Sequence, residues 1–336
     1  MDTLTHIVLG ACIGEAIAGK QLGKKALILG AIAQNIPDID FVASFWLATA
    51  QDVMAHRGFT HSFLFVLLLT PLLAYCSVKV FKSTGMDIRR WLLFWGAQIF
   101  IHIFIDAFNA YGTGWFEPFS HYRVSFNTMY VADPLFSIWP AIGMVVLLSI
   151  KPSSIKRMVW VKVTLGLSAL YLILGIGFKL FIDHTVEQEM RSKDIVSQKY
   201  FTTPTPLNNM LWYIVAQNDS GYDIGYRSVF DKNKGIDFHF VCRNDSLLKA
   251  SANGEDIDRL LLFSQGYYAA QLWHDTLVFN DLRFGEQLGW ATIEPKFVFH
   301  YFLQYPDDNK MIVQRGRFAG WGKAAIITFL KRIKGI

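Results

Sequence analysis

The stretch that decides the fold reads WLLFWGAQIFIHIFIDAFNA at residues 91–110. An apolar run of about 20 residues crosses the ~30 Å hydrocarbon core of a bilayer as a helix. Two ionisable residues interrupt it, His102 and Asp106, which are four apart and therefore share one helix face. Such residues cost roughly 2.5 to 3.5 kcal/mol each in a membrane segment, so we expect these two to hydrogen-bond each other or to share a metal.

Further apolar runs extend the same pattern along the chain. Runs at 63–80, 134–150 and 159–182 also have spanning length. Two shorter stretches, 7–19 and 26–36, are rich in Gly and Ala, which predicts a tightly packed helical hairpin because small residues let helices approach closely. The first 182 residues are therefore predicted to be mainly α, a multi-pass transmembrane helical bundle of four spans plus a short N-terminal hairpin.

The composition changes at about residue 183. Alternating aromatic and polar stretches predict a C-terminal β-rich extramembrane domain, with strands at 211–216, 222–230, 237–242, 276–284 and 297–304 and a helix at 256–263. We expect three parts: a membrane-embedded domain at 1–182, a β-rich outer-face domain at 183–317, and a basic tail at 318–336 that could lie along the membrane interface.

The totals agree with an integral membrane protein, at 52% hydrophobic and 18% charged residues. The net charge of +5 is small, and its basic residues form no patch with interleaved aromatics, which argues against a nucleic-acid partner. The three cysteines form no CxxC pair, so neither a disulfide framework nor a thiolate zinc site is predicted.

The orientation follows from lysine and arginine. The loops at 20–25, 77–90 and 151–162 together hold eleven of these residues, whereas the alternate loops, 37–62 and 111–133, hold only Arg57 and Arg123. This asymmetry predicts that the first three loops face the cytoplasm. The N-terminus, the alternate loops and everything after residue 182 are then expected on the outer side.

A second group of polar residues follows the second Gly/Ala-rich stretch, in the sequence PDIDF at 37–41. Pro37 disfavours helix at the residue before it, so the preceding helix should stop near Asn35. Asp38 and Asp40 then emerge at the membrane surface and, in an extended segment, point the same way. The alternative is a helix-terminating turn with solvated acids.

The segment HRGFTHS at 56–62 precedes the first long span. Its two histidines, His56 and His61, suit a borderline metal, and the planar fork of Arg57 suits phosphate or carboxylate oxygens. Helix capping by Thr60 or Ser62 is the simpler interpretation.

Two other regions offer further candidates. At the start of the chain, DTLTH at 2–6 places His6 at the opening of a helix, where an interfacial histidine is the alternative. Farther along, His121, Arg123 and Asp133 could complete a site, although Asp133 could equally terminate a helix.

Four pieces occur in a fixed order: DTLTH, PDIDF, HRGFTHS and, at 102–113, HIFIDAFNAYGT. In them the chain resembles the YdjM family of bacterial inner-membrane proteins, over roughly residues 1–135. This resemblance implies a metal-dependent hydrolase. The family is similar in turn to zinc-dependent phospholipase C and P1 nuclease, helical phosphodiesterases with a cluster of zinc ions.

On that analogy the metal ligands correspond to His6, Asp38 or Asp40, His56 or His61, and His102 with Asp106. The chain lacks the N-terminal tryptophan and the second downstream HxxxD-type pair of those soluble enzymes. The resemblance therefore implies one or two metal ions here, and not three.

Together these observations predict a multi-pass membrane hydrolase with one or two divalent ions, zinc first among them, at the outer face. The predicted metal residues are His6, Asp38, Asp40, His56, His61, His102 and Asp106. A bound metal acidifies a water molecule. We expect Asp38, where it is not a ligand, to take that water's proton, and Arg57 to stabilise negative charge in the reacting substrate.

The expected substrate is a phospholipid or another lipid-linked phosphoester, because the site opens at headgroup depth. The alternative is a metal-stabilised membrane scaffold or regulatory protein without turnover, whose outer domain recruits a protein partner. A transporter ranks third, because the ionisable residues gather toward one membrane face.

Overall fold

The computed structural model describes residues 1–193, 199–233, 235–249, 251, 253–292, 296–305, 309, 318 and 320–336. Two compact units make up the chain. The first, helical unit comprises Met1–Phe45, Ala55–Gly175 and Pro206–Asn208, and the second comprises Trp46–Met54, Ile176–Thr205 and Asn209–Ile336. The division between them falls inside one long helix.

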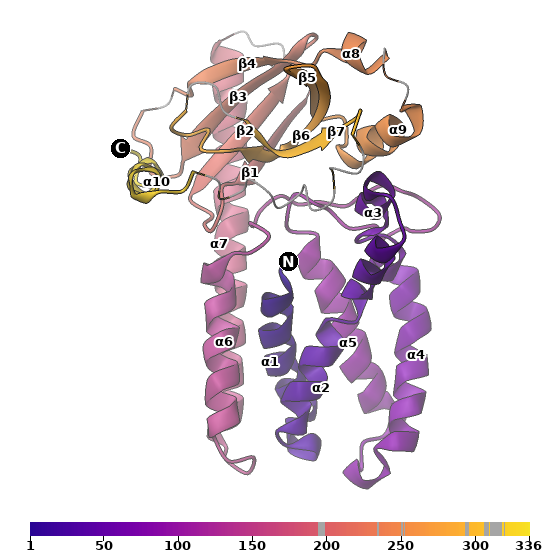
Figure 1. Ribbon diagram of the computed structural model, residues 1–336. Helices are drawn as coiled ribbons and strands as arrows, with labels where there is room; N and C mark the ends of the chain where they lie inside the picture. Colours follow the sequence, from indigo (N-terminus) through magenta and orange to yellow (C-terminus); the bar gives the residue numbers. More distant parts are fainter. Residues whose placement is uncertain are drawn as a thin grey trace. The chain divides into compact units, whose positions relative to one another are not determined.

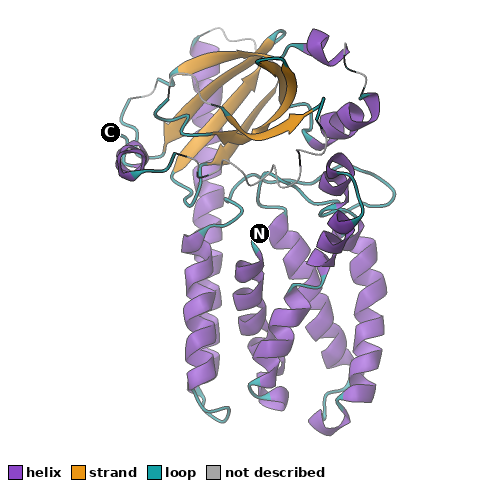
Figure 2. Cartoon of the chain, viewed as in Figure 1, coloured by secondary structure: helices purple, strands orange, loops and turns teal. Residues whose placement is uncertain are grey.

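The helices carry most of the first unit (Figure 1; Figure 2). The long ones are α1 (Thr3–Leu22), α2 (Lys25–Gln34), α4 (Phe63–Val80), α5 (Ile88–Asp106), α6 (Pro134–Ser149) and α7 (Lys156–Ser192). Shorter helices connect them: η1 (Pro37–Phe45), η2 (Phe59–His61) and η3 (Lys82–Thr84). A further short helix, α3 (Thr49–Ala55), lies between η1 and η2 in the sequence.

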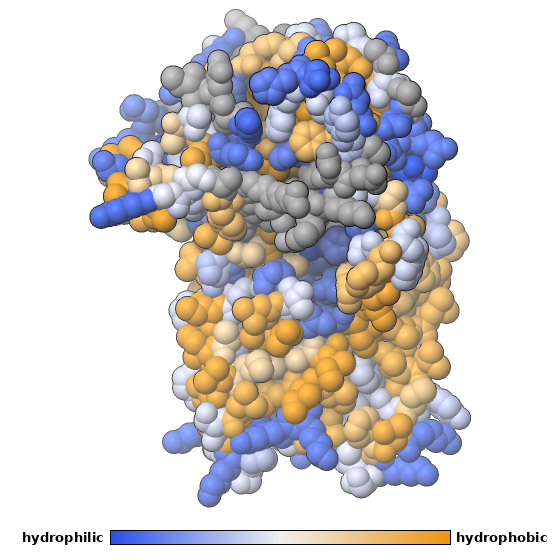
Figure 3. Space-filling model, in the orientation of Figure 1, coloured by the Kyte–Doolittle hydropathy of each residue, from blue (hydrophilic) through white to orange (hydrophobic). Residues whose placement is uncertain are grey.

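Among the described residues, three helices, α4, α5 and α7, are long and apolar enough to cross a membrane. The helix α2 and η1 could form a fourth crossing if this pair, bent by 55°, counts as one span. Many leucine, isoleucine and valine side chains of the three helices are exposed. In the view of Figure 3, hydrophobic residues gather on the lower part of the molecule, above a hydrophilic band at its lower end. Exposed apolar surface of this kind is typical of a lipid-facing bundle.

The predicted span at 134–150 is not confirmed. Its helix α6 has 16 residues, which corresponds to about 24 Å at 1.5 Å per residue and falls short of the ~30 Å core. Asp133 caps its start by accepting from Leu135 N, and Ile150 at its end is extended. The apolar run is therefore trimmed at both ends by local backbone structure.

The predicted N-terminal hairpin is confirmed as α1 and α2, which pack backbone to backbone. A Cβ atom built on Gly14 would lie 2.3 Å from the carbonyl oxygen of Ala26, and one on Gly30 would lie 2.2 Å from that of Gly10. Only glycine permits this approach. Close packing here sets the position of α2, whose C-terminal end carries part of the candidate site.

We expect Gly30→Ala to lower the free energy of unfolding by about 1 to 3 kcal/mol, because the added methyl group forces the two helices apart. Gly166→Ala is the matched control, since a Cβ at this α7 position meets nothing within 4 Å. Denaturant titration of both variants in bicelles measures the difference. Equal stability of the two variants would contradict the packing described.

Within its described residues, the second unit contains two antiparallel sheets. The first has the order β1-β2-β3-β4 and the second the order β5-β6-β7. The strands are β1 (Lys199–Pro204), β2 (Leu211–Gln217), β3 (Gly221–Ser228), β4 (Phe238–Cys242), β5 (Tyr268–Trp273), β6 (Thr276–Glu286) and β7 (Phe297–Phe302). The helices are α8 (Asp245–Lys249), α9 (Gly254–Phe263) and α10 (Lys323–Ile333).

The predicted β-rich region and its helix near 256–263 are confirmed, whereas β1 and β5 escaped the sequence analysis. The β1 strand ends in Pro204 and lies at a sheet edge, the position where a strand tolerates proline. The last turns of α7 pack on this sheet, with Ile182 and Val186 against Trp212. The predicted boundary at residue 317 lies outside the described residues.

Candidate metal centre

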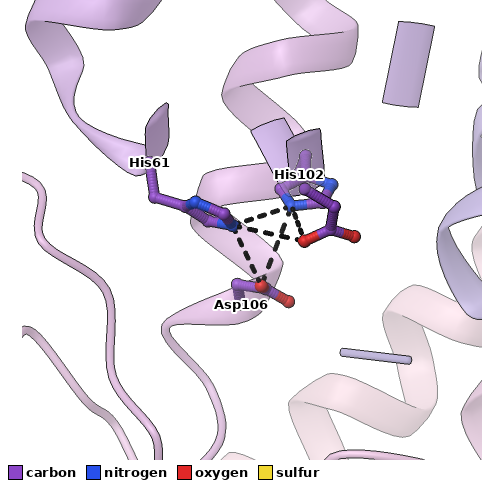
Figure 4. A group of neighbouring side chains, drawn as sticks. His61, His102 and Asp106 are labelled. Carbon is purple, nitrogen blue, oxygen red and sulfur yellow. Dashed lines mark hydrogen bonds and ion pairs between the residues drawn. The ribbon is translucent and has the colours of Figure 1, made fainter. Parts of the chain in front are cut away.

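Four ionisable side chains from three elements converge at one end of the helical unit: Asp38, His61, His102 and Asp106. The last turn of α5 supplies His102 and Asp106, η2 supplies His61, and η1 supplies Asp38. One ligand atom of each lies within 4.8 Å of the others. Figure 4 shows the imidazoles of His61 and His102 directed toward each other and toward the carboxylate of Asp106.

The hydrogen bonds of the two imidazoles identify their free nitrogens. His102 Nδ1 lies 2.5 Å from the Gln34 carbonyl oxygen, which can only accept, so this nitrogen carries a proton. His61 Nδ1 lies 3.0 Å from Thr60 Oγ1 and 3.3 Å from Asp40 Oδ2. With both Nδ1 atoms donating, both neutral rings present lone pairs on Nε2, and these two atoms are 3.1 Å apart.

Two lone pairs at this distance repel unless a cation lies between them or one ring takes a second proton. The other separations resemble the edges of a coordination polyhedron. Asp38 Oδ1 lies 3.5 Å from His61 Nε2 and 3.4 Å from His102 Nε2, and Asp106 Oδ2 lies 3.5 and 3.7 Å from them. Ligands about 2.0 to 2.1 Å from a tetrahedral centre are roughly 3.3 to 3.4 Å apart, so the four groups fit a zinc-sized cation.

Burial strengthens this interpretation. His61, His102 and Asp106 have fully buried side chains, and the Asp38 side chain is 20% exposed. Two carboxylates this close need a compensating positive charge. Arg57 provides one, with Nε 3.1 Å from Asp106 Oδ2. The Met1 amine, which contacts Asp106 Oδ1, is a second source of positive charge, and a divalent cation would add to both.

His6 lies against the group without belonging to it. Its Nε2 lies 3.0 Å from Asp106 Oδ1, and its ring stacks on that of His102 with centroids 3.8 Å apart. The Met1 amine also contacts Asp106 Oδ1. This arrangement is typical of an outer-shell histidine that orients a ligating carboxylate, and a ligand role for His6 stays a prediction.

Asp38 and Asp40 do not point the same way, because their segment is a 3-10 helix and not the extended chain expected from the sequence. Pro37 fits the start of a helix, where its missing N–H is not needed. Asp40 therefore faces the other side of His61, accepting from Arg57 N at 2.7 Å and from Thr60 Oγ1 at 3.1 Å. The preceding helix does end where predicted, with Asn35 as its C-cap.

The other residues of HRGFTHS stabilise the loop that carries His61. His56 is partly exposed and contacts Asp40 Oδ1 through Nδ1 at 3.2 Å, away from the four-residue group. Arg57 is buried in a left-handed conformation, with φ of 58°, and donates to Asn109 Oδ1 and the Met1 carbonyl. The helix-capping expectation is confirmed for Ser62, which accepts from Phe65 N.

The candidates at 121–133 lie apart from the group. His121 is exposed and contacts Glu117, and Arg123 donates to the His56 carbonyl. Asp133 accepts from Tyr171 at 2.7 Å, and burial raises the pKa of its carboxyl group to about 6. The interpretation of Asp133 as a helix-terminal residue is confirmed.

Two contributors escaped the sequence analysis: the Gln34 carbonyl, which orients His102, and Asn109, which holds Arg57. Gln98 is a second buried glutamine, and it donates to the Gly10 carbonyl at 3.0 Å. Backbone acceptors leave no trace in a sequence, because any residue type provides them.

We expect Asp40→Asn to weaken metal binding by roughly 10- to 100-fold, the effect typical of outer-shell partners of a ligating histidine. The substitution removes the negative charge that faces His61 Nδ1. The imidazole of His61 then has a weaker preference for the tautomer that carries its proton on Nδ1 and leaves Nε2 free. Competition with a chelator of known affinity measures the change. Asp133→Asn, which alters a buried carboxylate outside the group, serves as control, and equal affinities would refute an orienting role for Asp40.

Comparison with known proteins places this chain in a family. A model of the YdjM inner membrane protein family matches residues 1–181, more than half of the 336 residues. The uncharacterized protein YfhP of Bacillus subtilis (strain 168) is 30% identical over 148 residues, which are 41% of this chain and 43% of YfhP. The inner membrane protein YbcI of Escherichia coli (strain K12) is 33% identical over 123 residues, 36% of this chain and 69% of YbcI.

The matched part spans less than half the length of YfhP and about two thirds of YbcI. No solved structure matches the chain. The family model covers every residue of the four-residue group as well as α4 and α5. The resemblance expected from the four ordered motifs is thereby confirmed, and this chain belongs to the YdjM family of inner membrane proteins.

Proposed function

We propose that this protein is a membrane-bound metal-dependent hydrolase acting on a phosphoester or ester of a lipid. The observation that carries the proposal is the 3.1 Å approach of His61 Nε2 to His102 Nε2, flanked by two carboxylates. Paired imidazoles and carboxylates are ligands that zinc prefers. When bound, a zinc ion polarises a substrate oxygen and acidifies a water molecule.

The chain's own residues have distinct parts in this proposal. His61, His102 and Asp106, whose side chains are fully buried, would hold the cation. Asp38, the partly exposed fourth member of the group, would in this case not bind the cation, and its carboxylate could accept a proton from a water molecule. Arg57 is engaged with Asp106 and Asn109, so we assign it the positioning of Asp106 in place of direct contact with substrate.

The lipid assignment rests on the surroundings of the group. Exposed apolar side chains alternate with the polar ones on the same elements: Ile39 and Phe41 on η1, and Phe59 on η2, with exposed fractions of 58, 58 and 45%. Exposed apolar side chains next to polar ones on short helices suit the boundary between acyl chains and headgroups. A hydrolase at this depth meets phospholipid esters directly.

The outer-face orientation is part of the same proposal. The connections α1–α2, α4–α5 and α6–α7 carry most of the loop lysines and arginines and lie at the end of the helical unit opposite the four-residue group (Figure 1). Under the positive-inside rule those connections face the cytoplasm, so the group faces outward.

The deciding experiment incubates the purified full chain in nanodiscs with phosphatidylglycerol, phosphatidylethanolamine or a polyprenyl diphosphate. Phosphorus NMR follows the products with zinc, with chelator, and after zinc is restored. We expect product only with metal and none from His61→Ala, with His121→Ala as the active control. Metal-loaded protein that hydrolyses none of these substrates, or equal turnover by His61→Ala, would refute the assignment.

Burial supports a second candidate, a metal-stabilised scaffold without turnover. Three of the four groups have no exposed side-chain surface, and closed sites are typical of structural zinc. In that case chelation would unfold the helical unit while every substrate above stayed intact. A protein partner of the second unit would then carry the function.

A further inference from the structure

The terminal helix α10 has two unlike faces. One is docked on its own unit: Phe329 is 4% exposed, and its ring contacts Trp290 in a tilted and Trp321 in an edge-on arrangement, with ring centroids 4.6 and 5.1 Å away. Arg332 extends the docked side by a double ion pair to Asp231, at 2.6 and 2.9 Å. The helix therefore has a defined rotation about its axis, which decides what its other face presents.

The opposite face is apolar and exposed. Ile326, Ile327 and Leu330 have exposed fractions of 43, 45 and 51%. Spacings of three and four residues place these three side chains on one face of the helix. Phe329 lies to one side of this face, so the docking of Phe329 leaves Ile326, Ile327 and Leu330 exposed.

The rim of this face is basic. Lys323, Lys331 and Lys334 are exposed, and residues 318–336 contain no aspartate or glutamate. Lys323 and Lys334 lie seven residues before and four residues after Leu330, so both share its face at opposite ends. Long lysine stems can cover apolar surface while their ammonium groups reach outward. An apolar centre with a purely basic rim matches an anionic lipid surface better than a protein core.

We propose that α10 is an interfacial anchor that inserts Ile326, Ile327 and Leu330 into the headgroup boundary of an anionic bilayer. Charge complementarity is one argument for this occupant. The other is covalent: α7 carries a membrane-spanning stretch and continues without a break into the second unit, so this unit is attached directly at a membrane surface. The inference is independent of metal binding and of hydrolysis.

The anchor explains why α10 exposes three apolar residues although its other side is already packed against the second unit. Three apolar side chains alone bind a membrane weakly, and stable anchoring takes a second signal such as a basic cluster. The three lysines provide that signal. The span in α7 provides proximity, so the helix needs only local affinity.

The test uses the full chain with its exposed cysteines removed, as Cys76→Ser and Cys242→Ser, which leaves buried Cys12. An environment-sensitive fluorophore is attached at Ile327→Cys or, as matched control, at Thr328→Cys, an exposed neighbour one step around the helix. Both proteins are reconstituted into vesicles of phosphatidylglycerol with phosphatidylcholine, with and without a headgroup-region quencher lipid.

We expect quenching at 327 to exceed that at 328 by about threefold or more, and to fall in pure phosphatidylcholine. Replacing Lys323, Lys331 and Lys334 by glutamine should weaken insertion by about fivefold per lysine. A second label at Leu330→Cys repeats the measurement should one variant fold poorly. Equal, weak quenching at 327, 328 and 330 would overturn the proposal, as would efficient 327–327 cross-linking between copies without quenching.

Discussion

Protein carrying His61→Ala is expected to reach the membrane in normal amount and to purify without its metal. The substitution removes one of two facing Nε2 atoms and leaves Asp38 and Asp106 with a single imidazole partner. Loss of a direct ligand should exceed the roughly 10- to 100-fold effect of an outer-shell change. Elemental analysis of the purified protein, followed by chelator competition, gives both the stoichiometry and the affinity.

His121→Ala is the matched control for this result. It also removes a histidine from the same end of the helical unit, but His121 is exposed and contacts Glu117. We expect it to retain full metal content. If His61→Ala kept the same stoichiometry and affinity as the control, the four residues would not form the metal site.

Glu15→Ala is expected to lower the free energy of unfolding by about 3 to 5 kcal/mol, the largest stability effect that we predict. Glu15 in α1 and Arg157 in α7 form a buried bidentate pair with both N–O distances at 2.7 Å. Removing the carboxylate leaves a guanidinium uncompensated inside the bundle. Unfolding in bicelles, followed by tryptophan fluorescence, measures the loss.

A double variant makes the cause testable. Replacing both partners, Glu15→Met with Arg157→Met, removes the stranded charge and should recover much of the stability lost in Glu15→Ala. Recovery should be incomplete, because Arg157 Nη1 also donates to the carbonyl oxygens of Leu147 and Ile150. A double variant as unstable as the single one would show that packing, and not charge, dominates at this position.

The ion pair between Glu15 and Arg157 could not be predicted from the sequence. In the sequence, Glu15 lies in a stretch of small residues and Arg157 in a segment predicted to be a basic loop, and the two are 142 residues apart. Nothing local links them, because their pairing depends on which faces of α1 and α7 meet. The same holds for His102 and the Gln34 carbonyl, which lie 68 residues apart in the sequence.

The four-residue group was likewise predicted in part from the sequence and in part not. Its members were all among the seven predicted metal residues, since ionisable groups in apolar surroundings and the PDIDF and HRGFTHS motifs are visible in one dimension. The choice of Asp38 over Asp40 was not visible. It follows from the 3-10 conformation of η1, which turns the two carboxylates toward opposite nitrogens of His61.

The sequence by itself determined the membrane class, the helical hairpin, the long spans α4, α5 and α7, and the β-rich second unit. These depend on hydrophobic length and periodicity, and helix hydrogen bonds in lipid are satisfied within one segment. Local backbone structure at Asp133 and Ile150, which the hydropathy pattern did not reveal, made α6 shorter than the predicted span. Only the tertiary structure decided which carboxylates face which imidazoles and how Glu15 meets Arg157. Those outcomes depend on the rotation and contact of elements far apart in the chain, which residue order alone does not specify.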